Sequence, residues 1–155
     1  MIYVLIGISG SGKSTWAHNK WKKIPLGTIV VNRDKIRELL FGYNETNISE
    51  YYDRDDIYDL EKKVSFCEGN LITSACKMDL DVIVDATHLK VDYLKKYTAF
   101  PFYKFILFDT SLETCIERAA FRNRKVEKAI IENQYSNLQK LKNSSWFNLQ
   151  KYVIV

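Results

Sequence analysis

Apolar residues in this chain gather in short runs that alternate with longer stretches of helical periodicity. Five runs have the length and β-branched content of strands: residues 2–7, 28–31, 82–85, 103–108 and 152–155. The clearest helical repeat is Ile57, Leu60, Val64, Cys67, Leu71 and Ala75. Residues 13–22, 33–41, 90–98, 112–121 and 127–141 are also predicted to be helical, with Ser111 capping the fourth. Strands that alternate with helices predict a parallel sheet covered on both faces, hence an α/β fold of three layers.

Length and composition indicate an ordinary globular protein. The chain has 155 residues, 46% of them hydrophobic and 27% charged, so we expect one domain spanning residues 1–155. No apolar run is long enough to span a bilayer, and no basic segment precedes the first strand. Three cysteines without a CxxC motif are typical of reduced thiols, so we expect a cytoplasmic protein without membrane contact. The net charge of +4 is compatible with a phosphate-rich partner without indicating one.

A glycine-rich segment, GISGSGKST at residues 7–15, directly follows the first predicted strand. It matches the pattern G-x-x-x-x-G-K-[ST] in its required context of strand, loop and helix. Its glycines allow successive N–H groups to point into one concavity, which binds a polyphosphate at a helix N-terminus. Lys13 is placed to reach the β- and γ-phosphates, and the Ser14 hydroxyl to bind Mg²⁺. We therefore expect ATP to be held by Gly10, Ser11, Gly12, Lys13, Ser14 and Thr15.

A carboxylate follows the second predicted strand, in the segment Asn32-Arg33-Asp34. Ligands of a parallel sheet bind at the carboxyl ends of its strands, so Asp34 is expected at the same rim as the phosphate loop. There it can accept the proton of an attacking hydroxyl. Arg37, one turn later, is placed to hold an anionic group of the acceptor. The alternative is that Asp34 merely caps its helix, and the residues alone do not decide between the two roles.

Two further segments carry candidate chemistry. Asp85 ends a β-branched strand in the manner of a Walker B carboxylate, which binds Mg²⁺ through water or orients the acceptor. His88, shortly after it, is close enough to the site to hydrogen-bond a phosphate, but it is interpreted as a structural or an exposed residue. Arg118 and Arg122 share one helix face just before a helix break, which favours an arginine-bearing lid that closes over the triphosphate. The alternative for these arginines is a solvated basic helix end.

The order of these motifs resembles the 5′-kinase domain of phage-type polynucleotide kinase. The resemblance includes GSGKSTWA, then Asn32-Arg33-Asp34 with an arginine three residues on, then DATH at 85–88 and the two-arginine helix. It implies a P-loop kinase fold that transfers the γ-phosphate of ATP to the 5′-hydroxyl of DNA or RNA in end repair. We expect no accompanying phosphatase domain, and a phage-encoded protein of this kind is expected in the host cytoplasm.

The resemblance also implies roles for single residues. Asp34 corresponds to the general base, and Arg37 to the arginine that contacts the acceptor's 3′-phosphate. Lys13 and Arg122 correspond to residues that act on the transferred phosphoryl group, and Arg118 to a second lid arginine. Asp85 and Thr87 fall in the acceptor-side segment. One departure is Ser9, which stands where the family commonly has proline.

Two other functions remain open from the sequence alone. A small-molecule P-loop kinase, acting on a nucleoside, sugar acid or antibiotic, shares the loop, the acceptor-side aspartate and the lid arginines. Such an enzyme needs a closed pocket, whereas a polynucleotide kinase needs an open groove with basic and aromatic lining. We expect the polar stretch 42–52, which carries three tyrosines, to be a loop that serves the substrate. This stretch and the lysines Lys90, Lys95 and Lys96 are candidates for such a lining. The third possibility, a nucleotide-binding switch without turnover, conflicts with the complete set of catalytic groups.

Overall fold

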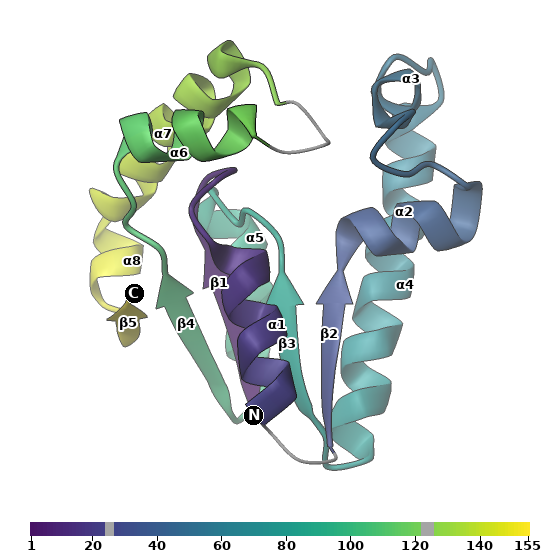
Figure 1. Cartoon of the computed structure of the whole chain (residues 1–155). Coiled ribbons are helices and arrows are strands. Elements are labelled where there is room, and N and C mark those ends of the chain that lie inside the picture. The colour runs from purple at the N-terminus through teal and green to yellow at the C-terminus, as the bar shows by residue number, and fades with distance from the viewer. Residues whose placement is uncertain (24–26, 122–125) are drawn as a thin grey trace.

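The computed structural model describes residues 1–23, 27–121 and 126–155. Within them lies a five-stranded sheet with the strand order β2-β3-β1-β4-β5, in which every neighbouring pair is parallel (Figure 1). The strands are β1 (Ile2–Ile6), β2 (Thr28–Asn32), β3 (Asp81–Asp85), β4 (Tyr103–Leu107) and β5 (Tyr152–Ile154). The predicted parallel five-stranded sheet is confirmed.

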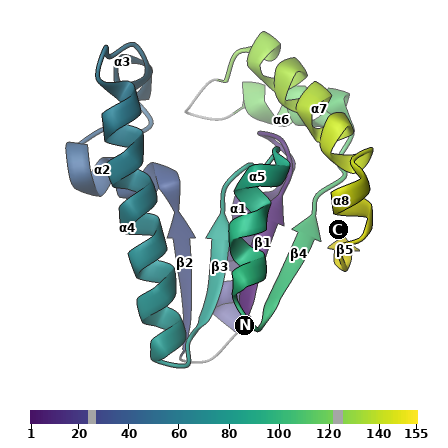
Figure 2. The same cartoon turned by 180° about the vertical axis from the view of Figure 1, so that it is seen from behind.

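Helices cover both faces of the sheet. They are α1 (Lys13–Lys23), α2 (Arg33–Phe41), α3 (Ile48–Tyr52), α4 (Ile57–Lys77), α5 (Val91–Lys95), α6 (Leu112–Ala120), α7 (Lys128–Lys142) and α8 (Ser145–Asn148), with a 3-10 turn, η1, at Lys96–Ala99. Helix α1 crosses one face, while α4 and α5 cover the opposite face (Figures 1 and 2). The three-layer prediction is therefore confirmed. None of the helices in these ranges is long and apolar enough to cross a membrane.

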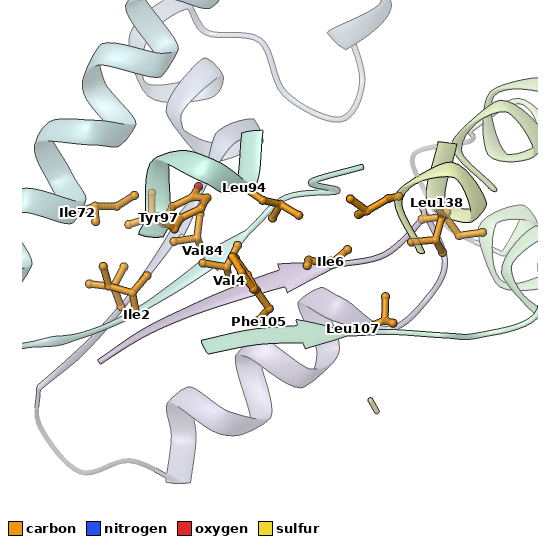
Figure 3. Close-up of a cluster of buried hydrophobic side chains, with 14 of the residues drawn as sticks. Ile2, Val4, Ile6, Ile72, Val84, Leu94, Tyr97, Phe105, Leu107 and Leu138 are labelled. Atoms are coloured by element: carbon orange, nitrogen blue, oxygen red, sulfur yellow. The ribbon is translucent and has the colours of Figure 1, made fainter. Parts of the chain in front are cut away.

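The core is divided by the sheet into a large and a small part. Successive side chains of a strand point to opposite faces, so Val4 and Ile6 join the large cluster while Leu5 joins the small one under α1. In the large cluster, side chains from the central strands meet Leu94 of α5 and Leu138 of α7 (Figure 3). This packing holds α5 and α7 against the sheet.

Helix α4 has the predicted extent but a different inner face. Its buried residues are Leu60, Val64, Glu68, Ile72 and Ala75. Leu71, which we expected on this face, is 41% exposed. Steps of four residues follow a slowly turning stripe on a helix, and here the stripe passes through the buried Glu68. Apolar periodicity does not reveal Glu68 as an inward-facing residue, because its side chain is charged.

The polar stretch 42–52 was predicted to be a loop, which is wrong for its second half. Residues Ile48–Tyr52 form α3, and Ile48 and Tyr51 pack against Leu60 of α4 in a small third cluster. One turn of helix forms here because two apolar side chains three residues apart reach the same neighbour. The predicted helix 90–98 is divided into α5 and η1, and α8 was not predicted. Ser111 does cap α6, accepting a hydrogen bond from the Thr114 N–H.

Candidate active site

The glycine loop connects β1 to α1 where the strand order of the sheet reverses. Strand β1 has β3 on one side and β4 on the other, and such a switch point is where open parallel sheets bind ligands. Gly10 has a φ of +85°, and a Cβ there would lie 2.3 Å from the carbonyl oxygen of Cys115 in α6. Only glycine fits this position, so α6 helps to set the shape of the loop.

Lys13 begins α1 and lies against the loop. Its Nζ donates to the carbonyl of Ile8 at 2.8 Å and to the hydroxyl of Ser11 at 3.3 Å. The side chain is largely buried, whereas the neighbouring Ser14 is exposed. The loop thus presents an ammonium and a hydroxyl at one helix start, the groups that bind a nucleotide phosphate and its metal ion.

A cavity of about 1300 Å³ lies over this rim of the sheet. The predicted site residues that line it are Gly10, Gly12, Lys13, Ser14, Asp34, Arg37, Asp85 and Thr87. Ser11, Thr15 and Arg118 are outside this lining, although Arg118 Nη1 is 3.9 Å from the position of a Cβ on Gly12. Arg122 lies outside the described residues. The structure therefore brings the phosphate loop and the acceptor-side residues to one cavity.

The N-cap of α2 is Asn32, whose Oδ1 accepts a hydrogen bond from the Lys35 N–H at 3.0 Å. Its amide nitrogen donates to Asp85 Oδ2, also at 3.0 Å, and so connects the ends of β2 and β3. Asp34 is in the first turn of the helix and is 49% exposed. Because Asn32 supplies the cap, the capping role that the sequence left open for Asp34 is filled by another residue.

Asp34 is paired with Arg37, and Arg37 is positioned by Glu61 of α4. Arg37 Nη1 lies 2.7 Å from Asp34 Oδ1. The Nε and Nη2 atoms of Arg37 donate to the two oxygens of Glu61 at 2.8 and 3.0 Å. Glu61 also accepts from Arg33 at 2.7 Å and from the Tyr51 hydroxyl at 2.7 Å. One carboxylate therefore joins α2, α3 and α4 at the edge of the cavity.

Burial of Glu61 opposes its ionisation, but hydrogen bonds from its arginine partners and Tyr51 outweigh burial and lower the pKa to about 2. We expect Glu61→Gln to reduce the free energy of unfolding by about 2 kcal/mol at pH 7, because Arg37 then loses a charged partner. The pKa of an unfolded glutamate is about 4.3. The stabilisation is therefore complete above about pH 4.5 and is lost as the pH falls toward 2.

Urea unfolding of both proteins at pH 7 and again near pH 3 measures this effect. Glu38→Gln is the matched control, since Glu38 is paired only with the exposed Lys35 among the ion pairs of the described residues, and we expect a much smaller change. A difference between Glu61→Gln and the wild type that stays constant with pH would show that the carboxylate charge is not its source.

His88 is buried and structural, in agreement with the sequence interpretation. Its Nδ1 lies 2.8 Å from the Leu5 carbonyl oxygen and its Nε2 lies 2.9 Å from the Tyr97 hydroxyl. Burial lowers its pKa to about 4, although the bond to Leu5 acts in the opposite direction. The ring is therefore neutral at pH 7 and supplies no positive charge to a phosphate.

Helix α7 contributes a contact that the sequence analysis missed. The backbone N–H of Ser9 in the phosphate loop donates to Gln134 Oε1 at 2.8 Å. Gln134 also lines the cavity. A glutamine on a predicted helix gives no sequence signal for such a contact. Glu61 was missed as well, because its partners Arg33, Arg37 and Tyr51 lie in other helices.

A family model described as an AAA domain matches residues 2–141, which covers both the phosphate loop and the Asp34 segment. The chain belongs to the AAA-domain family. The sheet order and the loop at its switch point also place this AAA domain among the P-loop kinase folds, which use a nucleotide.

The names of two similar proteins refer to nucleic acids. The chain is 33% identical over 156 residues to a protein of Autographa californica nuclear polyhedrosis virus named as a bifunctional polynucleotide kinase/RNA ligase. That alignment covers 94% of this AAA domain chain and 22% of the viral protein. A chain of the Pnkp1/Rnl/Hen1 RNA repair complex is 26% identical, with a TM-score of 0.75, over 91% of this chain and 44% of its own. The chain thus spans less than half the length of either relative.

A second similar structure is that of a nucleoside kinase. Deoxyadenosine kinase from M. mycoides, solved with bound dATP, has a TM-score of 0.66 and 17% identity. The match covers all of this chain and 90% of the kinase. At this identity the likeness concerns the fold alone.

Proposed function

We propose that this chain is an ATP- and Mg²⁺-dependent polynucleotide kinase that phosphorylates 5′-hydroxyl ends of DNA or RNA. The observation that carries the proposal is the placement of the Asp34 carboxylate and the Lys13 loop on one cavity of about 1300 Å³. That volume exceeds the usual range for a single small ligand, and so suits a nucleotide and a strand end together. The similarity to the viral polynucleotide kinase/RNA ligase and to a chain of the RNA repair complex supports the same substrate class.

In the proposed reaction Asp34 accepts the proton of the acceptor hydroxyl. As that O–H bond breaks, the hydroxyl oxygen forms a bond to the γ-phosphorus, and the bond from that phosphorus to the β–γ bridging oxygen breaks. ADP leaves with the electron pair of the broken bond. Lys13 neutralises charge on the transferred group, and Arg37 holds the acceptor phosphate beside Asp34. The lid roles of Arg118 and Arg122 belong to the same proposal.

Mg²⁺ fits the oxygen donors at this rim. The exposed hydroxyl of Ser14 and the carboxylate of Asp85 line the same cavity, and magnesium is commonly held by few protein oxygens together with substrate phosphates. Ser14 would bind the ion directly, and Asp85 through water. When bound, the ion neutralises phosphate charge.

The test is transfer of ³²P from γ-labelled ATP in the presence of Mg²⁺. The acceptors are 5′-hydroxyl DNA and RNA oligonucleotides, compared with a panel of nucleosides and sugar acids. Label on the oligonucleotides is the expected result. Label only on a nucleoside or sugar acid would instead establish a small-molecule kinase, and release of free phosphate alone would indicate an ATPase.

A further inference from the structure

Exposed tyrosines line the outer part of the candidate active site. Tyr52, at the end of α3, is 47% exposed, and Tyr58, at the start of α4, is 71% exposed. Both line the same cavity as Lys13 and Asp34. In Figure 1, α3 and the upper end of α4 stand beyond the carboxyl ends of the strands, on the β2 side of the sheet. The aromatic surface therefore lies on the acceptor side of the cavity.

Tyr52 is held by a residue of the site. Its ring centre lies 5.6 Å from the guanidinium carbon of Arg37, and its ring meets the ring of Tyr51 edge-on at 5.4 Å. Tyr51 is the fully buried member of the pair and packs with Ile48 and Leu60. Tyr52 is not part of that cluster. The contacts with Arg37 and Tyr51 therefore orient the exposed Tyr52 ring, although this ring is not part of the hydrophobic cluster.

We propose that Tyr52 stacks against the second nucleobase of a single-stranded acceptor, with Tyr58 continuing the surface. This inference rests on the proposed function. These residues are arranged in the order in which the groups of a strand follow one another. Asp34 meets the terminal 5′-hydroxyl, Arg37 meets the first phosphate, and Tyr52 meets the second nucleoside. Arg37 lies 2.7 Å from Asp34 and contacts the Tyr52 ring, so a phosphate on Arg37 places the following base beside Tyr52.

The chemistry of this surface suits nucleobases of any sequence. Every base has a π-face, and stacking on aromatic side chains is therefore tolerant of sequence. Lys62 Nζ lies 4.2 Å from the Tyr58 ring centre, which adds a positive charge where the backbone of a longer strand continues. The second base of a duplex end is stacked between its neighbours and cannot offer this face, so the site selects single-stranded ends.

The test compares two 5′-hydroxyl oligonucleotides, one intact and one with an abasic second nucleotide, in the wild type and three variants. For the wild type we expect the abasic substrate to lower kcat/KM by about 5- to 150-fold. Tyr52→Ala should lower kcat/KM by a similar factor on the intact strand and show little further loss on the abasic one. Tyr52→Phe keeps the ring and should remain within about threefold of the wild type.

Phe102→Ala is the matched control, because Phe102 is 68% exposed and outside this cavity. It should behave as the wild type on both substrates, and KM for ATP should be unchanged in every variant. The stacking proposal would be overturned if Tyr52→Ala lowered kcat/KM by the same factor on the intact and the abasic substrate. It would also be overturned if the wild type had the same kcat/KM for both substrates. Wild-type labelling of the intact strand tests the proposed function separately, and its absence would remove both proposals.

Discussion

Asp34→Asn is expected to lower kcat by about 10²–10⁴ with 5′-hydroxyl oligonucleotides, while KM for ATP changes little. Asparagine keeps the size of the side chain and can still accept a hydrogen bond from Arg37, so the fold and the acceptor phosphate site should persist. What it loses is the ability to take up the proton of the attacking hydroxyl. Steady-state kinetics with ATP and the oligonucleotide varied in turn measures both effects.

Asp59→Asn is the matched control for this experiment. Asp59 is also a first-turn carboxylate paired with a cation three residues later, Lys62, but it is outside the cavity. Its substitution should leave kcat unchanged. If Asp34→Asn retained activity within a few-fold of the wild type, the carboxylate would not be the general base.

Lys13→Ala is expected to reduce kcat/KM for ATP by about 10²–10³, equally for every acceptor. The ammonium lies inside the phosphate loop, bonded to the Ile8 carbonyl and the Ser11 hydroxyl. Its removal takes away a positive charge from the place where the β- and γ-phosphates are expected to bind. Because this loss concerns the nucleotide, DNA and RNA ends should be affected alike.

Lys20→Ala, on the same helix and outside the cavity, controls for loss of a charge from α1. Thermal unfolding of both variants shows whether the loop remains folded, which matters because the Lys13 side chain is largely buried. A rate for Lys13→Ala equal to that of the wild type would contradict the role given to the phosphate loop.

Local patterns were sufficient to predict the sheet and the position of the phosphate loop. Each strand contains a run of three or more apolar residues, and the phosphate loop follows the spacing G-x-x-x-x-G-K-[ST] directly after the first of them. Glu61 was missed because its partners come from α2 and α3, and nothing in the sequence around it shows that these helices meet. Leu71 was assigned to the core because the apolar repeat could not include a charged residue such as Glu68, which is buried only through its pairing with Arg33 and Lys96.

The roles of the candidate site residues remain predictions, but their placement answers one question that the sequence left open. Both Asn32 and Asp34 are suitable capping residues, and only the bond from the Lys35 N–H to Asn32 identifies the cap. Tyr51 and Tyr52 are neighbours of the same type, yet one fills the core and the other borders the cavity. Which of the two tyrosines is buried depends on how α3, a single short helix, is rotated about its axis.

The hydrogen bond between the Ser9 N–H and Gln134 has a consequence for how related sequences can diverge. Proline, common at the position of Ser9 in the kinases that this chain resembles, has no N–H to donate. A lineage that gains proline there loses the partner of Gln134, and selection on that glutamine is relaxed. We therefore expect positions 9 and 134 to covary among related sequences. Position 134, on the inner side of α7, should be glutamine where residue 9 has an N–H to donate, and should vary where residue 9 is proline.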